Sequence, residues 1–225
     1  MRRSAGLREP IKVAMFDLDG TLIDTMNGFA DVAAAVMAEL HGIDAVAARR
    51  CYLETSGIPF RQQLDLIVPD HAANDRASEI FEERKRAHAD AANLDEATEI
   101  ALEQLRRSGL KIVVSSNSAQ HFVDDFAARQ RFPFDLVLGF DAATSFAKGQ
   151  PHVDRTVREL GVTTSEIVFC GDSIKDGELA HACGLAFVAR LGTFALEDFR
   201  RWTPSVIAVT DIPALAELLA TRAAA

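Results

Sequence analysis

Six short, almost unbroken apolar runs restrict the fold of this chain more than any other feature of its sequence. They are residues 11–16, 111–115, 135–139, 166–170, 185–189 and 205–209. Strands that are apolar along their whole length are typical of a parallel sheet covered by helices on both faces. Most of the runs are separated by helical patterns, at 93–109, 119–129 and 152–160, and a last one begins at Asp211. This alternation predicts an α/β fold with a right-handed parallel sheet.

Residues 24–93 interrupt the alternation, because they contain no convincing strand. Phe29 and Val36 belong to one helical spacing, and further helical patterns cover 44–52, 60–68 and 75–92. A crossover between two parallel strands needs far fewer residues than this. We therefore expect an inserted all-helical domain at 24–93 and a core domain formed by 1–23 and 94–225. Asn93 is the expected N-cap of the helix that follows.

Composition and charge exclude several classes of protein. The 225 residues are 48% hydrophobic and 25% charged, as in an ordinary globular chain. With 24 basic and 33 acidic residues, the net charge of −9 disfavours a nucleic-acid partner. The 3 cysteines form no C-x-x-C pair, and no apolar run reaches membrane-spanning length. We expect a cytoplasmic protein without a membrane partner, with most of its histidines on the surface or packed in the insertion.

Two carboxylates follow the first apolar run. Asp17 and Asp19 come directly after Val13-Ala-Met-Phe, and Gly20 permits a sharp exit. Two acids at the end of a buried strand repel each other and lose water, which is costly unless a cation is present. Mg²⁺ binds to one or two carboxylates and leaves room for a substrate phosphate. The alternative is a turn in which the two aspartates only cap the next helix.

Polar residues also follow three later strands. Ser116 and Asn117 come after the second run, Lys148 lies in the loop after the third, and Asp172 and Asp176 follow the fourth. The carboxyl ends of parallel strands meet at one edge of a sheet, which is where ligands bind in open α/β folds. Helix N-termini after these loops add N–H donors for an anion.

Chemistry then assigns a function to each group. The first acid, Asp17, is the better nucleophile for phosphorus and would form an aspartyl-phosphate. Asp19 would act as general acid and base. Lys148 and Ser116 would bind the phosphoryl oxygens. The two acids of the last segment would complete the metal site, the second of them as a ligand through water or as a support.

Four segments resemble, in order and spacing, the signature motifs of the haloacid dehalogenase-like superfamily: Asp17-Leu-Asp19-Gly-Thr-Leu, Ser116-Asn117, Lys148 and Gly171-Asp172-Ser-x-x-Asp176. Within this superfamily, the chain resembles the phosphoglycolate phosphatase and β-phosphoglucomutase-like proteins. The resemblance implies a Rossmann-like core, a helical type-one cap and a Mg²⁺-dependent phosphatase reaction through an aspartyl-phosphate. It also implies metal binding by Asp17, the backbone carbonyl of Asp19 and an acid of the last motif. Because the dehalogenases lack the second acid, Asp19 favours phosphoryl chemistry.

Two parts of the pattern leave alternatives open. The third motif is often Lys-Pro, whereas this chain has Lys148-Gly-Gln-Pro, so Lys111 and Lys175 are the nearest alternatives to Lys148. In the insertion, Gly57 would shape a substrate loop and Arg61 would contact a second anionic group. These two residues are also explained by an ordinary turn between helices with a surface arginine.

We therefore expect a phosphoric monoester hydrolase that acts on a small phosphorylated metabolite, as a monomer or homodimer. A sugar phosphomutase of the same superfamily is the alternative. A phosphonate-cleaving relative would need a cap lysine, and Lys85 is the only lysine in the insertion. A receiver-like signalling domain would be about half this length, and a non-catalytic binding protein would have no need of the complete set of catalytic groups.

Overall fold

The protein is described here by a computed structural model of residues 10–223, and it consists of two compact units. One unit runs to Ile23 and resumes at Asn93, and the other is Asp24–Ala92. The second unit therefore ends one residue earlier than the insertion expected from the sequence. No helix within residues 10–223 has the length and apolar character needed to span a membrane.

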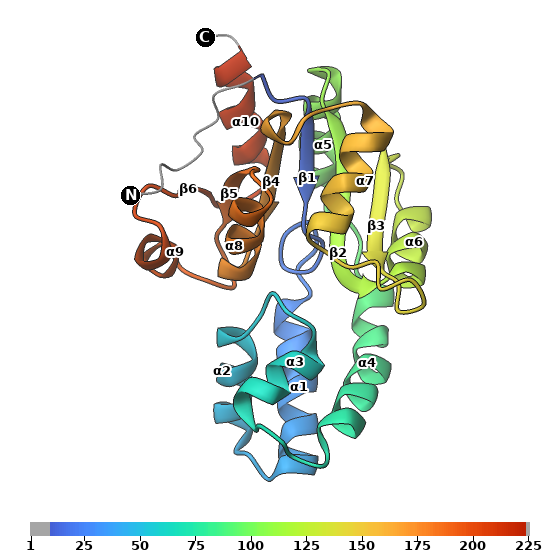
Figure 1. Ribbon diagram of the computed structural model, residues 1–225, viewed down its shortest axis with the longest axis vertical. Helices are drawn as coiled ribbons and strands as arrows, with labels where there is room; N and C mark the ends of the chain where they lie inside the picture. Colours follow the sequence, from blue (N-terminus) through green and yellow to red (C-terminus); the bar gives the residue numbers. More distant parts are fainter. Residues whose placement is uncertain (1–9, 224–225) are drawn as a thin grey trace. The chain divides into compact units, whose positions relative to one another are not determined.

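The first unit contains a six-stranded sheet in which all neighbouring strands are parallel (Figure 1). The strands are β1 (Val13–Phe16), β2 (Lys111–Ala119), β3 (Leu136–Phe140), β4 (Ile167–Gly171), β5 (Ala186–Arg190) and β6 (Ile207–Val209). Their order is β3-β2-β1-β4-β5-β6, which is the order of a doubly wound Rossmann-type sheet. The predicted fold class is confirmed, and each apolar run corresponds to one strand.

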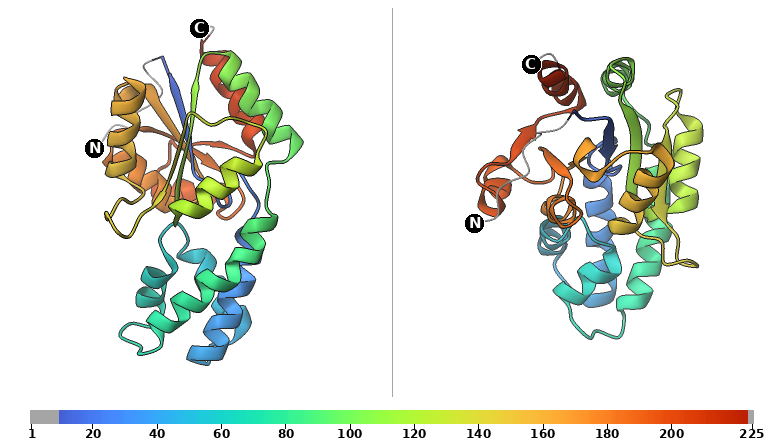
Figure 2. Two further views of the ribbon diagram at one scale, coloured as in Figure 1. Left: turned by 90° about the vertical axis from the view of Figure 1, so that its right-hand side faces the viewer. Right: turned by 45° about the horizontal axis from the view of Figure 1, so that its top comes forward.

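Helices cover both faces of this sheet (Figure 2, left). One face carries α5 (Glu96–Arg107), α6 (Gln120–Arg129) and α10 (Ile212–Ala223), and the other carries α7 (Gln150–Leu160), α8 (Ile174–Ala182) and α9 (Leu196–Trp202). A short 3₁₀ helix, Thr164–Glu166, precedes β4. Val13 and Met15 of β1 share one core cluster with Val153 of α7 and Ala180 of α8. Since helices pack on both faces, the central strands are apolar along their whole length.

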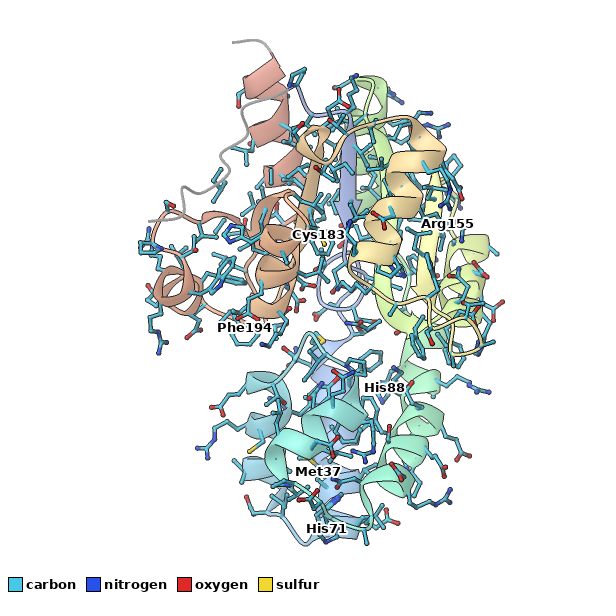
Figure 3. The ribbon with its side chains drawn as sticks, in the orientation of Figure 1. Met37, His71, His88, Arg155, Cys183 and Phe194 are labelled. Carbon is cyan, nitrogen blue, oxygen red and sulfur yellow. The ribbon has the colours of Figure 1, made fainter. Side chains whose placement is uncertain are left out.

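The second unit consists of α1 (Met26–His41), α2 (Ala45–Glu54), α3 (Phe60–Ile67) and α4 (Asn74–Ala91). Met37, labelled in Figure 3, lies in its core on α1. Phe60 and Phe81 pack there with ring centroids 4.3 Å apart. Asp44 starts α2, because its carboxylate accepts hydrogen bonds from the N–H groups of Val46 and Ala47. These four helices correspond to the four helical patterns of the insertion.

The structure differs from the sequence-based description in three places. The N-cap of α5 is Asp95, whose carboxylate accepts from the N–H of Thr98 at 2.7 Å, and not Asn93. Ser116 and Asn117 lie inside β2 rather than after it. The connection between β5 and β6 contains a helix, α9, in addition to the helical patterns named from the sequence.

Candidate active site

The strands β1 and β4 are neighbours at the topological switch point of the sheet, where the chain stops adding strands on one side of β1 and starts adding them on the other. From β1 the chain order runs to β2 and β3 on one side, and to β4, β5 and β6 on the other. Phe16 pairs with Cys170, and the N–H of Asp17 donates to the carbonyl of Cys170 at 2.9 Å. Asp172 follows the end of β4. The register of two strands thus places both acids at the switch point, where ligands bind in this class of sheet.

Three buried carboxylates meet there. Asp17, Asp172 and Asp176 each offer an oxygen, and these oxygens all lie within 4.8 Å of one another. The close approach depends on Gly171, because a Cβ at that position would lie 2.6 Å from the Cβ and Cγ of Asp176. Of the motif-derived acids, Asp19 is outside this group of three.

A capping box at the start of α8 fixes Asp176. Its Oδ2 accepts hydrogen bonds from the N–H of Ser173 at 3.1 Å and from the Ser173 hydroxyl at 2.6 Å. Its own N–H donates back to Ser173 Oγ at 3.1 Å. The reciprocal bonds hold the carboxylate at the helix N-terminus, where the helix dipole favours negative charge.

Lys148 is the one lysine of the three candidates that enters the cluster. Its Nζ lies 2.6 Å from Asp17 Oδ1 and 2.6 Å from Asp176 Oδ1, and its side chain is 2% exposed. Burial opposes its charge, but the carboxylates of Asp17 and Asp176 outweigh burial and raise the pKa of Lys148. The alternatives have other partners, since Lys111 pairs with Asp135 and Lys175 with Glu178.

The carboxylates outnumber the ammonium group by three to one, so the cluster has an excess of buried negative charge. Burial, with the nearby charges of Asp176 and Asp172, raises the pKa of Asp17 well above its usual value, although Lys148 opposes the shift. Burial and the charge of Asp176 also raise the pKa of Asp172 to about 7. A divalent cation would relieve this repulsion, and carboxylate oxygens are ligands that Mg²⁺ prefers. The donor set therefore fits a metal ion.

Two hydroxyl residues beside the cluster were not found from the sequence. Ser118 Oγ donates to Asp19 Oδ2 at 3.0 Å, and the N–H of Ser118 donates to Ser116 Oγ at 3.0 Å. Thr193 Oγ1, in the loop after β5, donates to Asp172 Oδ2. Neither belongs to a motif, and only the tertiary arrangement brings them to the acids.

Ser116 is buried, and Asn117 is half-buried beside it in β2. The pairing of β2 with β3 shifts register between Ser115 and Ala119. These last residues of β2 therefore lie at an irregular carboxyl end of the strand. Their contact with a phosphate stays a prediction.

The two candidate residues of the insertion lie in the second unit. Gly57 has a φ of +94° in the turn between α2 and α3. Arg61 forms ion pairs with Asp65 and Asp75 inside the same unit. Their contact with a substrate stays a prediction.

Known proteins resemble this chain over most of its length. The sequence profile of the family described as haloacid dehalogenase-like hydrolase matches residues 14–190. A phosphoglycolate phosphatase of Pseudomonas syringae pv. tomato is 27% identical in an alignment of 193 residues that covers 79% of this chain and 68% of that protein. A phosphoglycolate phosphatase of Chromobacterium violaceum is 28% identical in an alignment of 188 residues that covers 80% of this chain and 84% of that protein.

The fold is shared with solved structures as well. A haloacid dehalogenase-like family hydrolase of Streptococcus pneumoniae superposes with a TM-score of 0.75 at 20% identity, over 92% of this chain and 98% of that one. The family match spans all four motifs, from Asp17 to Asp176, and the resemblance expected from the sequence is confirmed. The chain belongs to the haloacid dehalogenase-like hydrolase family.

Proposed function

We propose that the protein is a Mg²⁺-dependent phosphatase that hydrolyses a small phosphorylated metabolite through an aspartyl-phosphate on Asp17. The observation that carries this proposal is the buried cluster in which Lys148 contacts Asp17 and Asp176, with Asp172 beside them. Both curated relatives described above are phosphoglycolate phosphatases, so phosphoglycolate is the first substrate to test. We expect the enzyme to act in the cytoplasm, as a monomer or homodimer.

The reaction would proceed in two displacements. A carboxylate oxygen of Asp17 attacks phosphorus, the bond from phosphorus to the ester oxygen breaks, and Asp19 gives its proton to the leaving alcohol. Asp19, now a carboxylate, takes a proton from water as the water attacks phosphorus. The bond to Asp17 then breaks and inorganic phosphate leaves. Ser118 orients the Asp19 carboxylate for both proton transfers.

Charge on the transferred phosphoryl group would be balanced by fixed cations and donors. Lys148 and Ser116 would bind its oxygens, with Asn117 close by. Asp17, Asp172 and the backbone carbonyl of Asp19 would hold Mg²⁺, which supplies neutralisation of the developing negative charge. Because Asp176 is held by Ser173 and Lys148, we infer that it supports the metal site from behind or through a water.

The contacts of Lys85 disfavour the phosphonate-cleaving alternative, in which this amine would form a Schiff base with the substrate. It is buried in the second unit, 2.8 Å from Glu82 and over the rings of Phe29 and Phe81. A paired, positively charged amine is a poor nucleophile.

The first test is phosphate release by the purified protein from p-nitrophenyl phosphate and from phosphoglycolate. We expect release with Mg²⁺, none with excess chelator, and none from Asp17→Asn. Asp135→Asn is the control, because Asp135 precedes β3 at the opposite edge of the sheet. Turnover by Asp17→Asn at the wild-type rate would contradict the proposal. Transfer of phosphate to a second hydroxyl of a sugar phosphate, without net release, would indicate the mutase alternative.

The function of Asp19 can be tested separately with Asp19→Asn. Nitrophenolate leaves without a proton, whereas an alkyl alcohol does not, so the first displacement should persist only with the aryl ester. We expect about one equivalent of nitrophenol per protein, followed by slow turnover, because water is no longer deprotonated. Steady turnover at the wild-type rate with both esters would exclude Asp19 as acid and base.

A further inference from the structure

His152 is a fully buried histidine in the first turn of α7, four residues after Lys148. Both of its ring nitrogens have partners on different strands. Nδ1 lies 2.9 Å from Ser115 Oγ of β2, and Nε2 lies 3.1 Å from the carbonyl oxygen of Gly139 of β3. The ring therefore joins one helix to two strands.

The partners determine where the proton of the ring lies. A carbonyl oxygen only accepts, so Nε2 carries the hydrogen, and Nδ1 accepts from the Ser115 hydroxyl. Burial, with the charges of Lys148 and Arg155, lowers the pKa of His152 to about 4, although the bond to Gly139 opposes the shift. The neutral ring and both hydrogen bonds are thus maintained at neutral pH. Arg155 is labelled on α7 in Figure 3, close to one helical turn beyond His152.

The junction around the ring is tightly packed. A Cβ on Gly139 would lie 2.7 Å from the Cα of Gln120 and 2.9 Å from the carbonyl oxygen of Ser118. The N–H of Gly139 donates to Gln120 Oε1 at 2.7 Å, so both sides of this residue are fixed by side chains. The ring of Phe146 lies against the imidazole, with centroids 4.7 Å apart. A displacement of the ring would therefore move its neighbours.

The ring bridges the strands where their backbone pairing is irregular. The register of β2 with β3 shifts between Ser115 and Ala119, and this interval includes Ser116. Ser115 is the residue directly before Ser116, and the loop that ends at α7 carries Lys148. His152 thus connects the two segments that present the proposed phosphate-binding groups.

We propose that His152 is a positioning residue that holds Ser116 and Lys148 at a fixed separation, so that both reach one phosphoryl group. This inference rests on the proposed phosphatase function. It follows from the geometry, because the imidazole is a rigid spacer between a strand end and the helix that follows the lysine loop. Misplacement of a reacting or binding group by about 1 Å can reduce a rate by about a hundredfold.

The test compares His152→Leu with variants that keep part of its bonding. Leucine removes both hydrogen bonds, and we expect kcat/KM for the phosphate ester to fall about ten- to a hundredfold. His152→Asn and His152→Gln each retain polar atoms near one ring nitrogen, so they should recover part of the loss. Inorganic phosphate, used as a competitive inhibitor, should bind to the leucine variant more weakly in the same proportion as KM rises.

The matched control is Thr156→Val on the same helix. Thr156 is also fully buried, and its Oγ1 donates to the backbone carbonyl of His152 at 2.9 Å. Valine has a similar shape, so this change should lower the melting temperature while kcat, KM and phosphate inhibition stay within about twofold. All variants are assayed well below their melting temperatures.

The inference and the proposed function fail in different ways. A wild type that releases no phosphate would contradict the function, and the inference with it. An active wild type combined with a folded His152→Leu whose constants match those of Thr156→Val would overturn the inference alone. Histidine ¹⁵N NMR of the wild type adds a readout without turnover. We expect a protonated Nε2 and a bare Nδ1, and the reverse assignment would contradict the proposed bridge.

Discussion

The lysine–carboxylate contacts where the strands of the sheet begin differ in burial and in charge balance from those where the strands end. These two sides of the sheet are called its two edges below. At the edge where the strands begin, Lys12 pairs with Glu166 at 2.6 Å and Lys111 with Asp135 at 2.9 Å. Each lysine has one acid in its pair, and the lysine side chains are 57% and 56% exposed. Solvent screens such pairs, which contribute little to stability.

At the edge where the strands end, one lysine faces several acids away from solvent. Lys148 contacts Asp17 and Asp176, and Asp172 lies within the same cluster. Desolvation makes such a cluster costly, and the negative charge is not balanced within it. Groups whose pKa values are strongly shifted are concentrated at functional sites. The exposed pairs at the other edge are ordinary surface ion pairs. The edge where the strands end therefore carries the candidate active site and is called the reactive edge below, whereas the edge where they begin carries exposed ion pairs.

The largest difference between the edges should come from removing their lysines. Lys148→Met leaves buried carboxylates without their cation, and we expect a loss of about 3–5 kcal/mol in the free energy of unfolding of the metal-free protein. We also expect kcat to fall about a hundred- to a thousandfold, because a fixed donor to the phosphoryl group is lost. Lys111→Met should change stability by less than about 1 kcal/mol and leave kcat unchanged. Urea unfolding and phosphate release measure both, and equal effects at the two edges would contradict the contrast.

The pH dependence of stability should distinguish the edges next. The pKa of Asp172 is about 7 in the folded protein, above its ordinary value of 3.8. A raised folded pKa gives stability that is present below pH 3.8 and lost as pH rises through about 7. With chelator, the wild type should therefore be less stable at pH 8 than at pH 6, by about 1.4 kcal/mol from this one group.

Asp172→Asn should remove that loss, because it deletes one buried charge. At pH 8 with chelator the variant should be more stable than the wild type, yet it should gain no stability from added Mg²⁺. Asp135→Asn, at the other edge, should keep the Mg²⁺ response of the wild type. Thermal unfolding at the two pH values, with and without Mg²⁺, is the measurement. An Asp172→Asn protein that Mg²⁺ still stabilises would place the metal elsewhere.

The sequence predicts the reactive edge better than it predicts its surroundings. The unbroken apolar runs predict the parallel strands. The positions at which those strands end predict which polar side chains lie close together, so Asp17, Lys148 and Asp172 can be identified from the sequence. Boundaries fail by a few residues where local signals compete. Both Asn93 and Asp95 are good N-cap residues, and only the observed geometry selects Asp95.

The residues that support the site have no such signature. Ser118, Thr193 and His152 reach their partners through tertiary register, and serines, threonines and histidines at similar spacings occur in many surface loops. A hydrogen bond across many positions of sequence leaves no periodic pattern. These supporting residues are consequently visible only in the folded arrangement.

The smallest expected effect concerns one such support. Thr193 follows β5 and donates its hydroxyl to Asp172 Oδ2, which orients a proposed metal ligand. Thr193→Val keeps the shape but removes this bond, and partners of this kind contribute about ten- to a hundredfold to metal affinity. We expect weaker Mg²⁺ binding by calorimetry, with kcat restored at saturating Mg²⁺, and Thr193→Ser should recover the affinity. Thr210→Val is the control, because Thr210 donates at 3.0 Å to the exposed Asp211, outside the cluster. If Thr193→Val binds Mg²⁺ as tightly as Thr210→Val does, Asp172 is held by its strand alone, and the supporting hydroxyl has no part in the difference between the two edges.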